Sequence, residues 1–226
     1  MLERVAPTTA AAMADHWNSR AWKFDGSASH RRDADAWRAA FKTALGEAPR
    51  EVADLGCGTG ACALFAGNLG HRVTAVDGSA EMLSHAKAAA AGAGLSINFI
   101  HATMDEAALP AASADIVTLR NVLWTIENPS AALSLARKVL RPGGKLLVSD
   151  GVWFRHRAND SRKIFGAHLP FYNGLTEADA RHLLGNAGFG EIKSWRHLMP
   201  GDPYGAVYDD PETPIAFFIL TAIAPE

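Results

Sequence analysis

Cysteine is scarce in this sequence, and an excess of positive charge is absent. The two cysteines, Cys57 and Cys62, are too few for a disulfide framework or a zinc site. We therefore expect both thiols to be reduced and packed, and we expect no bound metal. The formal net charge is −2 and the sequence pI is near 6.5. Because nucleic-acid binders usually carry a basic stripe or a high pI, nucleic acid is not an expected partner.

Long hydrophobic runs are also missing. No stretch of about 18 uninterrupted apolar residues occurs, so we predict no transmembrane helix and no membrane partner. The first residues, MLERVAPTTAAAMADHW, lack the basic start and apolar run of a signal peptide, so we expect a cytoplasmic protein. Hydrophobic residues still make up 48% of the 226 residues, which is enough for a sizeable core.

Segments that predict strands alternate with segments that predict helices through the middle of the chain. The predicted strands span 51–55, 71–77, 95–100, 113–120 and 145–150, and the predicted helices span 60–69, 79–91 and 130–140. A turn, RPGG, is expected at 141–144 before the fifth strand. This alternation predicts an α/β fold with a parallel sheet and helices on both faces.

Both ends of the chain depart from the alternation. Helices are expected over 8–20 and 33–45, and the second would place Trp37 and Phe41 on one face. After a helix over 176–187, two strands near 189–197 and 215–224 follow with no helix between them. We therefore predict an antiparallel hairpin at one edge of a doubly wound, Rossmann-like, seven-stranded and mostly parallel sheet.

The sharpest motif is DLGCGTG, residues 54–60, between a predicted strand and a predicted helix. Its glycines allow a tight turn and a close approach of the backbone to a ligand. The helix behind the loop offers free N–H groups at its N-terminus. Asp77 ends the next strand, and its spacing from Gly56 matches the roughly 20 residues of units in which an acid accepts ribose hydroxyls.

A nicotinamide dinucleotide also fits part of this pattern, because Gly56, Gly58 and Ala61 satisfy G-x-G-x-x-G/A. Asp54 argues against it, since a carboxylate would repel a pyrophosphate but suits a cationic amino acid group. The predicted hairpin and the lack of a Tyr-x-x-x-Lys pair also disfavour an oxidoreductase. We keep that activity as an alternative.

With these motifs the sequence resembles the class I S-adenosylmethionine-dependent methyltransferases. DLGCGTG (54–60) and AVDGSAEML (75–83) are similar to the first two family motifs. SADIVTLRNVLW (113–124) and VLRPGGKLLVSD (139–150) resemble the regions of the fourth and fifth strands. The resemblance covers roughly residues 50–150. It implies a methyltransferase that uses S-adenosylmethionine and releases S-adenosylhomocysteine; a non-catalytic S-adenosylmethionine-binding regulator would carry the same motifs.

The resemblance implies a role for each residue of the donor site. Gly56, Gly58 and Gly60 would lie against the donor's ribose and amino acid tail. Asp54 would face the donor's ammonium, directly or through water, and Asp77 would hold the ribose hydroxyls. Further donor contacts are expected from Cys57, Gly78, Met82 against adenine, the Arg120 backbone beside the sulfonium, and Trp17 and Arg20 of the N-terminal segment.

The residue at the edge of the adenine is left open. Counting from the third predicted strand places Thr103 and Met104 there, whereas counting back from Leu109-Pro110 places Asp105 there. The segment departs from the usual family pattern of an acid, a small residue and then Leu-Pro.

The acceptor site is expected outside the nucleotide-binding half. Its candidates are aromatic residues and histidines on the flanking segments: Trp22, Phe24, His30, Trp124, Trp153, His168 and Tyr172. No catalytic residue stands out, because methyl transfer needs a base only when the acceptor must lose a proton. His168 and Tyr172 are the candidates, although Pro170 between them disfavours a regular helix.

The expected acceptor is a small molecule. The chain has no Asn/Asp-Pro-Pro-Tyr/Phe motif, which would stack a flipped base. The sequence leaves open the acceptor atom and the oligomeric state, a homodimer included. We predict one domain over 1–226: an N-terminal helical extension or lid (1–47), a donor-binding core (48–150), and an acceptor-side insertion with the C-terminal hairpin (151–226).

Overall fold

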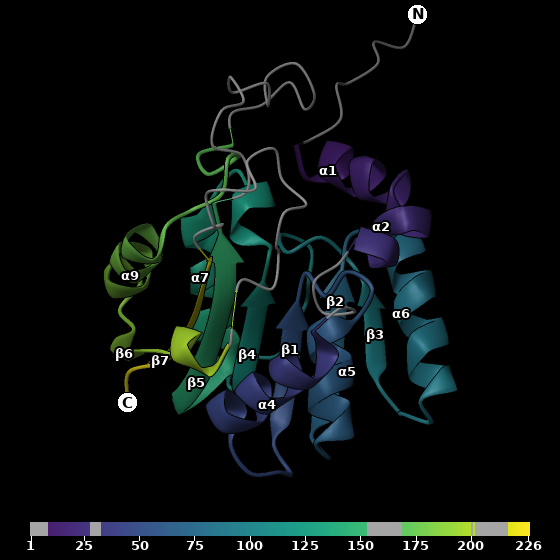
Figure 1. The fold of residues 1–226 in the computed structure, drawn as a ribbon. Helices are drawn as coiled ribbons and strands as arrows, with labels where there is room; N and C mark the ends of the chain where they lie inside the picture. Colours follow the sequence, from purple (N-terminus) through teal and green to yellow (C-terminus); the bar gives the residue numbers. More distant parts are fainter. Residues whose placement is uncertain (1–8, 28–32, 153–168, 200, 202–216) are drawn as a thin grey trace, which may run out of the picture.

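A computed structural model describes residues 9–27, 33–152, 169–199, 201 and 217–226. Within these residues the centre of the fold is a seven-stranded sheet in the order β3-β2-β1-β4-β5-β7-β6 (Figure 1). Its strands are β1 (Glu51–Leu55), β2 (Arg72–Asp77), β3 (Asn98–His101), β4 (Ala114–Arg120), β5 (Leu140–Gly151), β6 (Gly190–Ser194) and β7 (Phe217–Ile223).

The sheet is mixed, as expected. Strands β1 to β5 pair in parallel, with β1 between β2 and β4. Strand β7 pairs antiparallel with both β5 and β6, so it lies between them. The late pair of strands therefore forms an antiparallel edge, although β7 alone runs against the sheet and β6 shares the direction of the parallel strands.

Helices cover both faces of the sheet. Those of the described residues are α1 (Thr9–Asn18), α2 (Ala21–Ser27), α4 (Ala34–Leu45), α5 (Ala61–Asn68), α6 (Ala80–Gly92), α7 (Pro129–Val139) and α9 (Glu177–Asn186), with single turns η1 (Leu123–Thr125) and η2 (Arg196–Leu198). Helices α4 and α5 pack on one face, and α7 and α9 pack on the other. In Figure 1, α1 and α2 lie above the top of α6.

Side chains alternate between two apolar layers, because successive residues of a strand point to opposite faces. On β5, Leu146 and Val148 join the layer beneath α7 and α9, and Leu147 joins the layer beneath α4 and α5. The predicted face of α4 is confirmed, since Trp37 and Phe41 are fully buried. The two layers fix the strands and hence the loops that follow them.

Two predicted boundaries were wrong. The helix expected over 8–20 ends at Asn18, and a separate helix begins at Ala21. The RPGG segment forms a bulge inside β5 and not a turn before it, because pairing with β4 passes from Leu140 directly to Lys145. Positive φ at Gly143 and the close approach of Gly144 to the Arg141 carbonyl allow this bulge. None of the helices described is long and apolar enough to cross a membrane.

Candidate functional site

The site lies where the order of the strands reverses direction. Strand β1 is followed by a loop that leads to α5, and the neighbouring β4 is followed by a loop that leads to α7. The chain thus leaves the two strands toward opposite faces, which opens a crevice at their carboxyl ends. In Figure 1 the arrowheads of these strands point toward α1 and α2.

The glycine loop is fixed on one side and open on the other. Gly56, Gly58 and Gly60 all have positive φ, at 70°, 54° and 91°. The Gly56 N–H donates to the Val76 carbonyl at 2.8 Å. A Cβ on Gly56 would lie 2.6 Å from Val122, whereas a Cβ on Gly58 would meet nothing within 4 Å. The open side of the loop therefore lies at Gly58.

Asp77 lies beside this open side. One carboxylate oxygen accepts the Gly58 N–H and the other accepts the Ser79 N–H, both at 2.8 Å. Burial raises the pKa of Asp77, against the opposing effects of these hydrogen bonds and of His101 nearby. Each carboxylate oxygen can accept more than one hydrogen bond, so the group can hold the loop and still receive hydroxyl donors from a ligand.

Asp54 is enclosed behind the loop, with 1% of its surface exposed. Its carboxylate accepts the Thr118 hydroxyl at 2.6 Å and the Ala63 N–H at 3.0 Å. Burial raises the pKa of Asp54 to about 6, although both hydrogen bonds act in the opposite direction. The side chain thus joins β1 to β4 and to the first turn of α5.

The side chain of Arg120 braces the same region. Its guanidinium lies 4.2 Å from the centre of the Trp37 ring, in a cation–π contact with α4. Its charge also favours the ionised form of Asp54. The Arg120 backbone ends β4 at the crevice, where the sequence places it beside a ligand.

The segment after β3 also reaches the loop. Met104 Cε would lie 3.2 Å from a Cβ on Gly56, and Thr103 Cγ2 would lie 3.4 Å from a Cβ on Gly78. The Thr103 hydroxyl donates to Glu106 at 2.9 Å. Asp105 is exposed. Of the three candidates for the adenine edge, the structure brings Met104 to Gly56 of the glycine loop and Thr103 to Gly78, next to Asp77.

Three long-range hydrogen bonds hold the N-terminal helices over the crevice. Asn18 at the end of α1 accepts the Ser79 hydroxyl at 2.7 Å and the Glu81 N–H at 3.2 Å. The Thr59 hydroxyl donates to Asp25 of α2 at 2.7 Å. Asn18 and Asp25 were not among the predicted site residues, because their partners are distant in the chain and no local pattern marks them.

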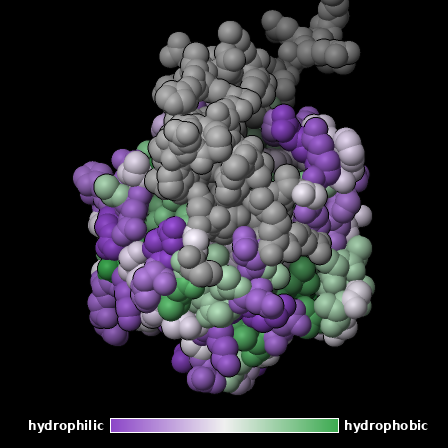
Figure 2. Space-filling view, in the orientation of Figure 1, coloured by the Kyte–Doolittle hydropathy of each residue, from purple (hydrophilic) through white to green (hydrophobic). Residues whose placement is uncertain are grey.

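Aromatic rings continue from these helices toward the expected acceptor region. The Trp17 ring contacts Phe24 at 5.8 Å and Trp124 at 6.0 Å, and Trp124 contacts Tyr172 at 6.3 Å between centroids. We call these four residues the aromatic cluster. Tyr172 is buried, and the other three rings are partly buried. Figure 2 shows a mainly hydrophilic surface over α1 and α2.

The structure does not bring every candidate together. Trp22 is 76% exposed and lies outside the aromatic cluster. Arg20 is exposed, and Met82 is buried within α6. His30, Trp153 and His168 lie outside the described residues. The structure thus leaves the roles expected for these residues as predictions.

Both cysteines are free and buried, as expected. Burial raises the pKa of the Cys57 and Cys62 thiols well above the usual range, and the nearby Asp54 charge acts in the same direction. Thiols in this state are poor nucleophiles. No group of three or more histidines, cysteines or acids that could hold a metal occurs in the part of the chain described.

Comparisons with known proteins point to one family. Residues 53–148 match a family model described as a methyltransferase domain. The chain is 31% identical to the ubiquinone biosynthesis O-methyltransferase of Xanthomonas axonopodis pv. citri over 141 residues, which cover 62% of this chain and 57% of the relative. The corresponding enzyme of Escherichia coli O6:H1 is 28% identical, with 61% and 57% covered. The chain thus spans less than two thirds of these curated relatives.

Solved structures share the fold at lower identity. Geranyl diphosphate C-methyltransferase from Streptomyces coelicolor A3(2) matches with a TM-score of 0.70 and 14% identity, covering 97% of this chain and 100% of that one. Phosphoethanolamine N-methyltransferase 2 of Haemonchus contortus matches with a TM-score of 0.66 and 17% identity, covering 100% of this chain and 59% of that one. Likenesses at this level support the fold and do not identify an acceptor.

We expect Asp54→Asn to stabilise the protein at neutral pH. Because the pKa of Asp54 is raised to about 6, the native state binds its proton more readily than the unfolded state. Ionisation therefore costs stability as the pH rises from about 4 to above 6, by up to about 3 kcal/mol. Asparagine keeps the shape of the side chain without the charge: its oxygen can accept the Ala63 N–H, and its amide group can donate to the Thr118 hydroxyl oxygen, which can act as donor or acceptor.

Urea denaturation of both proteins at about pH 4 and about pH 7.5 tests this expectation. The gain in unfolding free energy should be largest at the higher pH and small at the lower. Asp77 titrates in both proteins, so its own contribution largely cancels in the difference, and the remainder is its charge interaction with Asp54. If the variant is no more stable than the wild type at either pH, ionisation of Asp54 does not lower the free energy of unfolding as we expect.

We expect Asn18→Ala to loosen the N-terminal helices without unfolding the core. Loss of the two hydrogen bonds to Ser79 and Glu81 should raise amide exchange in α1 by about five- to tenfold. Hydrogen–deuterium exchange with mass spectrometry measures this, with α4 as an internal reference.

Ser19→Ala is the matched control, because the Ser19 hydroxyl bonds only the His16 carbonyl within the same helix end. Equal exchange in the two variants would show that the contact between Asn18 and α6 does not hold the helices down.

Proposed function

We propose that this chain transfers the methyl group of S-adenosylmethionine to a small molecule, because residues 53–148 match a methyltransferase domain. The curated relatives are named as O-methyltransferases of ubiquinone biosynthesis. The structural neighbours include complexes with S-adenosylmethionine and S-adenosylhomocysteine.

One observation carries the proposal: the open side of the glycine loop at Gly58 faces the carboxylate of Asp77. The Gly58 N–H already donates to Asp77, so the loop and the acid are held in register before a ligand arrives. An adenosyl group fits here with its ribose hydroxyls on Asp77 and its tail along the loop. Met104 and Thr103 close the adjoining wall.

Asp54 contributes negative charge from behind the loop. Its carboxylate is enclosed behind the loop and only 1% exposed, so we propose that it acts on the donor's ammonium through its electric field and not through direct contact. A buried carboxylate interacts strongly with a nearby cation because the local dielectric is low. The same charge disfavours a pyrophosphate, which supports a sulfonium donor over a nicotinamide dinucleotide.

The donor, when bound, supplies a methyl group that its sulfonium already activates. The chain's own residues then have to align the acceptor and exclude water. Helices α1 and α2, held by Asn18 and Asp25, would cover the crevice for this purpose. A lone pair on the acceptor attacks the methyl carbon as the carbon–sulfur bond breaks, and any acceptor proton passes to solvent or to a base.

We propose that the acceptor is a flat, apolar molecule that carries a hydroxyl group. The aromatic cluster supports this class, since Trp17, Trp124 and Tyr172 come from three separate segments that meet beside the crevice. Aromatic rings favour flat apolar ligands through stacking and edge contacts. The O-methyltransferase relatives favour oxygen as the acceptor atom.

We expect S-adenosylmethionine and S-adenosylhomocysteine to bind the wild type with micromolar affinity and Asp77→Ala at least about 100-fold more weakly. The physical reason is the loss of the hydrogen bonds to both ribose hydroxyls. Isothermal titration calorimetry measures the affinities, and thermal melting checks that the variant is folded. Asp35→Asn, on the exposed surface of α4, is the control.

Absence of binding by the wild type together with a clear signal from NADH would overturn the donor assignment in favour of an oxidoreductase. Tight donor binding with no methylation of any hydroxylated aromatic acceptor would favour a binding protein without catalysis.

With an acceptor in hand, Trp124→Phe should raise its KM several-fold and leave the Kd of S-adenosylhomocysteine unchanged. The change replaces the indole of Trp124 by a smaller phenyl ring and keeps the aromatic cluster apolar. Trp22→Ala is the comparison, because Trp22 lies outside the cluster and is 76% exposed. A larger rise in KM for Trp22→Ala than for Trp124→Phe would locate the acceptor on the outer surface of α2.

A further inference from the structure

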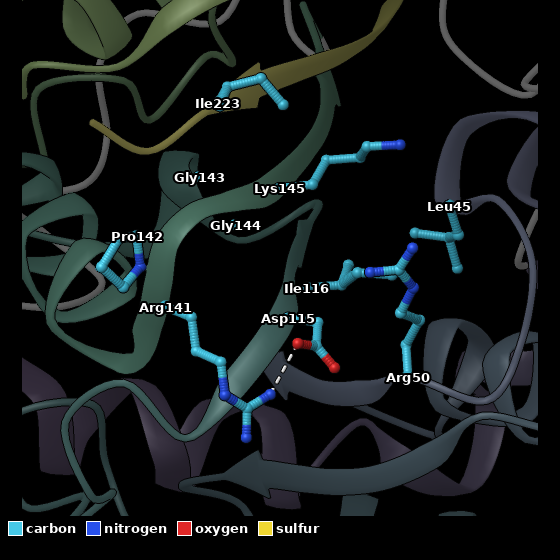
Figure 3. Close-up of a pocket in the computed structure, with 10 residues that line it drawn as sticks. All are labelled: Leu45, Arg50, Asp115, Ile116, Arg141, Pro142, Gly143, Gly144, Lys145 and Ile223. Atoms are coloured by element: carbon cyan, nitrogen blue, oxygen red, sulfur yellow. Dashed lines mark hydrogen bonds and ion pairs between the residues drawn. The ribbon is translucent and has the colours of Figure 1, made fainter. Parts of the chain in front are cut away.

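A second cavity lies at the opposite end of the sheet from the glycine loop. It has a volume of about 300 Å³ and is formed where β4 and β5 begin and β7 ends (Figure 3). Its lining includes Leu45 at the end of α4, Ile116, Ile223 and the bulge Arg141–Lys145. This volume is at the lower end of the range for small-molecule sites.

Most of the charged side chains in the lining are cationic. Arg50, Arg141 and Lys145 face the cavity against a single carboxylate, that of Asp115. Just beyond the lining, Lys193 and the exposed Glu226 add one charge of each sign. The cavity therefore has an excess of about two positive charges, in a protein whose formal net charge is −2.

Both carboxylate oxygens of Asp115 accept a hydrogen bond from a neighbouring group. One oxygen accepts the Arg141 guanidinium at 2.6 Å, as Figure 3 shows, and the other accepts the Glu51 N–H at 2.8 Å. Although burial acts in the opposite direction, the hydrogen bonds from Glu51 and Arg141 and the charge of Arg50 lower the pKa of this carboxyl. Asp115 thus neutralises Arg141 and leaves the other two cations in excess.

Arg50 and Lys145 carry that excess. Lys145 Nζ donates one hydrogen bond, to the Ala44 carbonyl at 2.8 Å, which leaves two of its donors. Burial lowers the pKa of Lys145, and the charges of Arg50 and Lys193 act in the same direction. Within the described residues, no hydrogen bond or ion pair engages the Arg50 guanidinium. In Figure 3 both side chains extend toward the side of Leu45.

We propose that this cavity binds a small organic phosphate, held by Arg50 and Lys145. A phosphate monoester carries a charge of about −1.5 to −2 at neutral pH, which matches the positive excess of the cavity. The planar guanidinium can bind two phosphate oxygens at once, and the ammonium supplies a compact charge beside it. A simple carboxylate would leave part of the positive charge uncompensated.

The site is independent of the donor crevice. It lies at the amino ends of β4 and β5, whereas Gly58 and Asp77 lie at the carboxyl ends of the parallel strands. The bulge that shapes it has no room for larger residues, since a Cβ on Gly144 would lie 2.7 Å from the Arg141 carbonyl oxygen. Because the two sites lie at opposite ends of the sheet, phosphate binding should leave the affinity for the methyl donor unchanged.

Titration calorimetry of the full chain with sodium pyrophosphate, which presents the same phosphate oxygens with a larger negative charge than a monoester, tests whether the cavity binds phosphate groups. We expect wild-type binding with a Kd below about 1 mM, weakened about tenfold by Arg50→Gln and by Lys145→Met. Arg38→Gln, which removes an exposed arginine of α4 outside the cavity, should bind like the wild type. Saturating S-adenosylhomocysteine should not reduce pyrophosphate binding.

Arg50 is exposed at its own position, so Arg50→Gln should fold normally even if Lys145→Met loses stability with its bond to Ala44. Lack of pyrophosphate binding to the wild type overturns the proposal. Equal weakening by Arg38→Gln, or competition by S-adenosylhomocysteine, also overturns it. If the chain binds no methyl donor, the pyrophosphate result still stands alone, because the two sites share no residue.

Discussion

The carboxylate of Asp54 is the group on which the geometry of the crevice depends. It accepts a hydroxyl from β4 and a backbone N–H from α5 while it belongs to β1, so it fixes the three elements between which the glycine loop turns. The cost is a buried charge, which raises its pKa to about 6. A neutral amide has one acceptor oxygen and would not accept both of these hydrogen bonds. We propose that the negative charge also serves the cationic donor in the crevice.

The crevice is built in layers around this group. Arg120 packs on Trp37 behind Asp54 and joins the end of β4 to α4. Asp77 fastens the loop from the side of β2 through the Gly58 N–H. The N-terminal helices then close over the opening through Asn18 and Asp25. These contacts of Arg120, Asp77, Asn18 and Asp25 add to the packing of the two apolar layers, which already fixes the positions of the strands.

Charge is arranged differently at the two ends of the sheet. The carboxyl ends of the parallel strands present Asp54 and Asp77, whereas the amino ends of β4 and β5 present Arg50 and Lys145 beside a cavity. A sulfonium donor suits the first environment and a phosphate suits the second. The small net charge of the chain does not reveal this separation, because the positive and negative charges at the two ends partly cancel in the total.

The order of the strands, the mixed sheet and the glycine loop with Asp77 could all be predicted from the sequence alone. The periodicity of hydrophobic residues predicts the strands and helices, and the clustered glycines indicate a tight turn. Only the folded structure shows that Asn18 and Asp25 hold the N-terminal helices, that Met104 approaches the glycine loop, that RPGG is a bulge, and that Trp22 is exposed. Those outcomes depend on contacts between segments far apart in the chain, and a local pattern carries no record of such contacts.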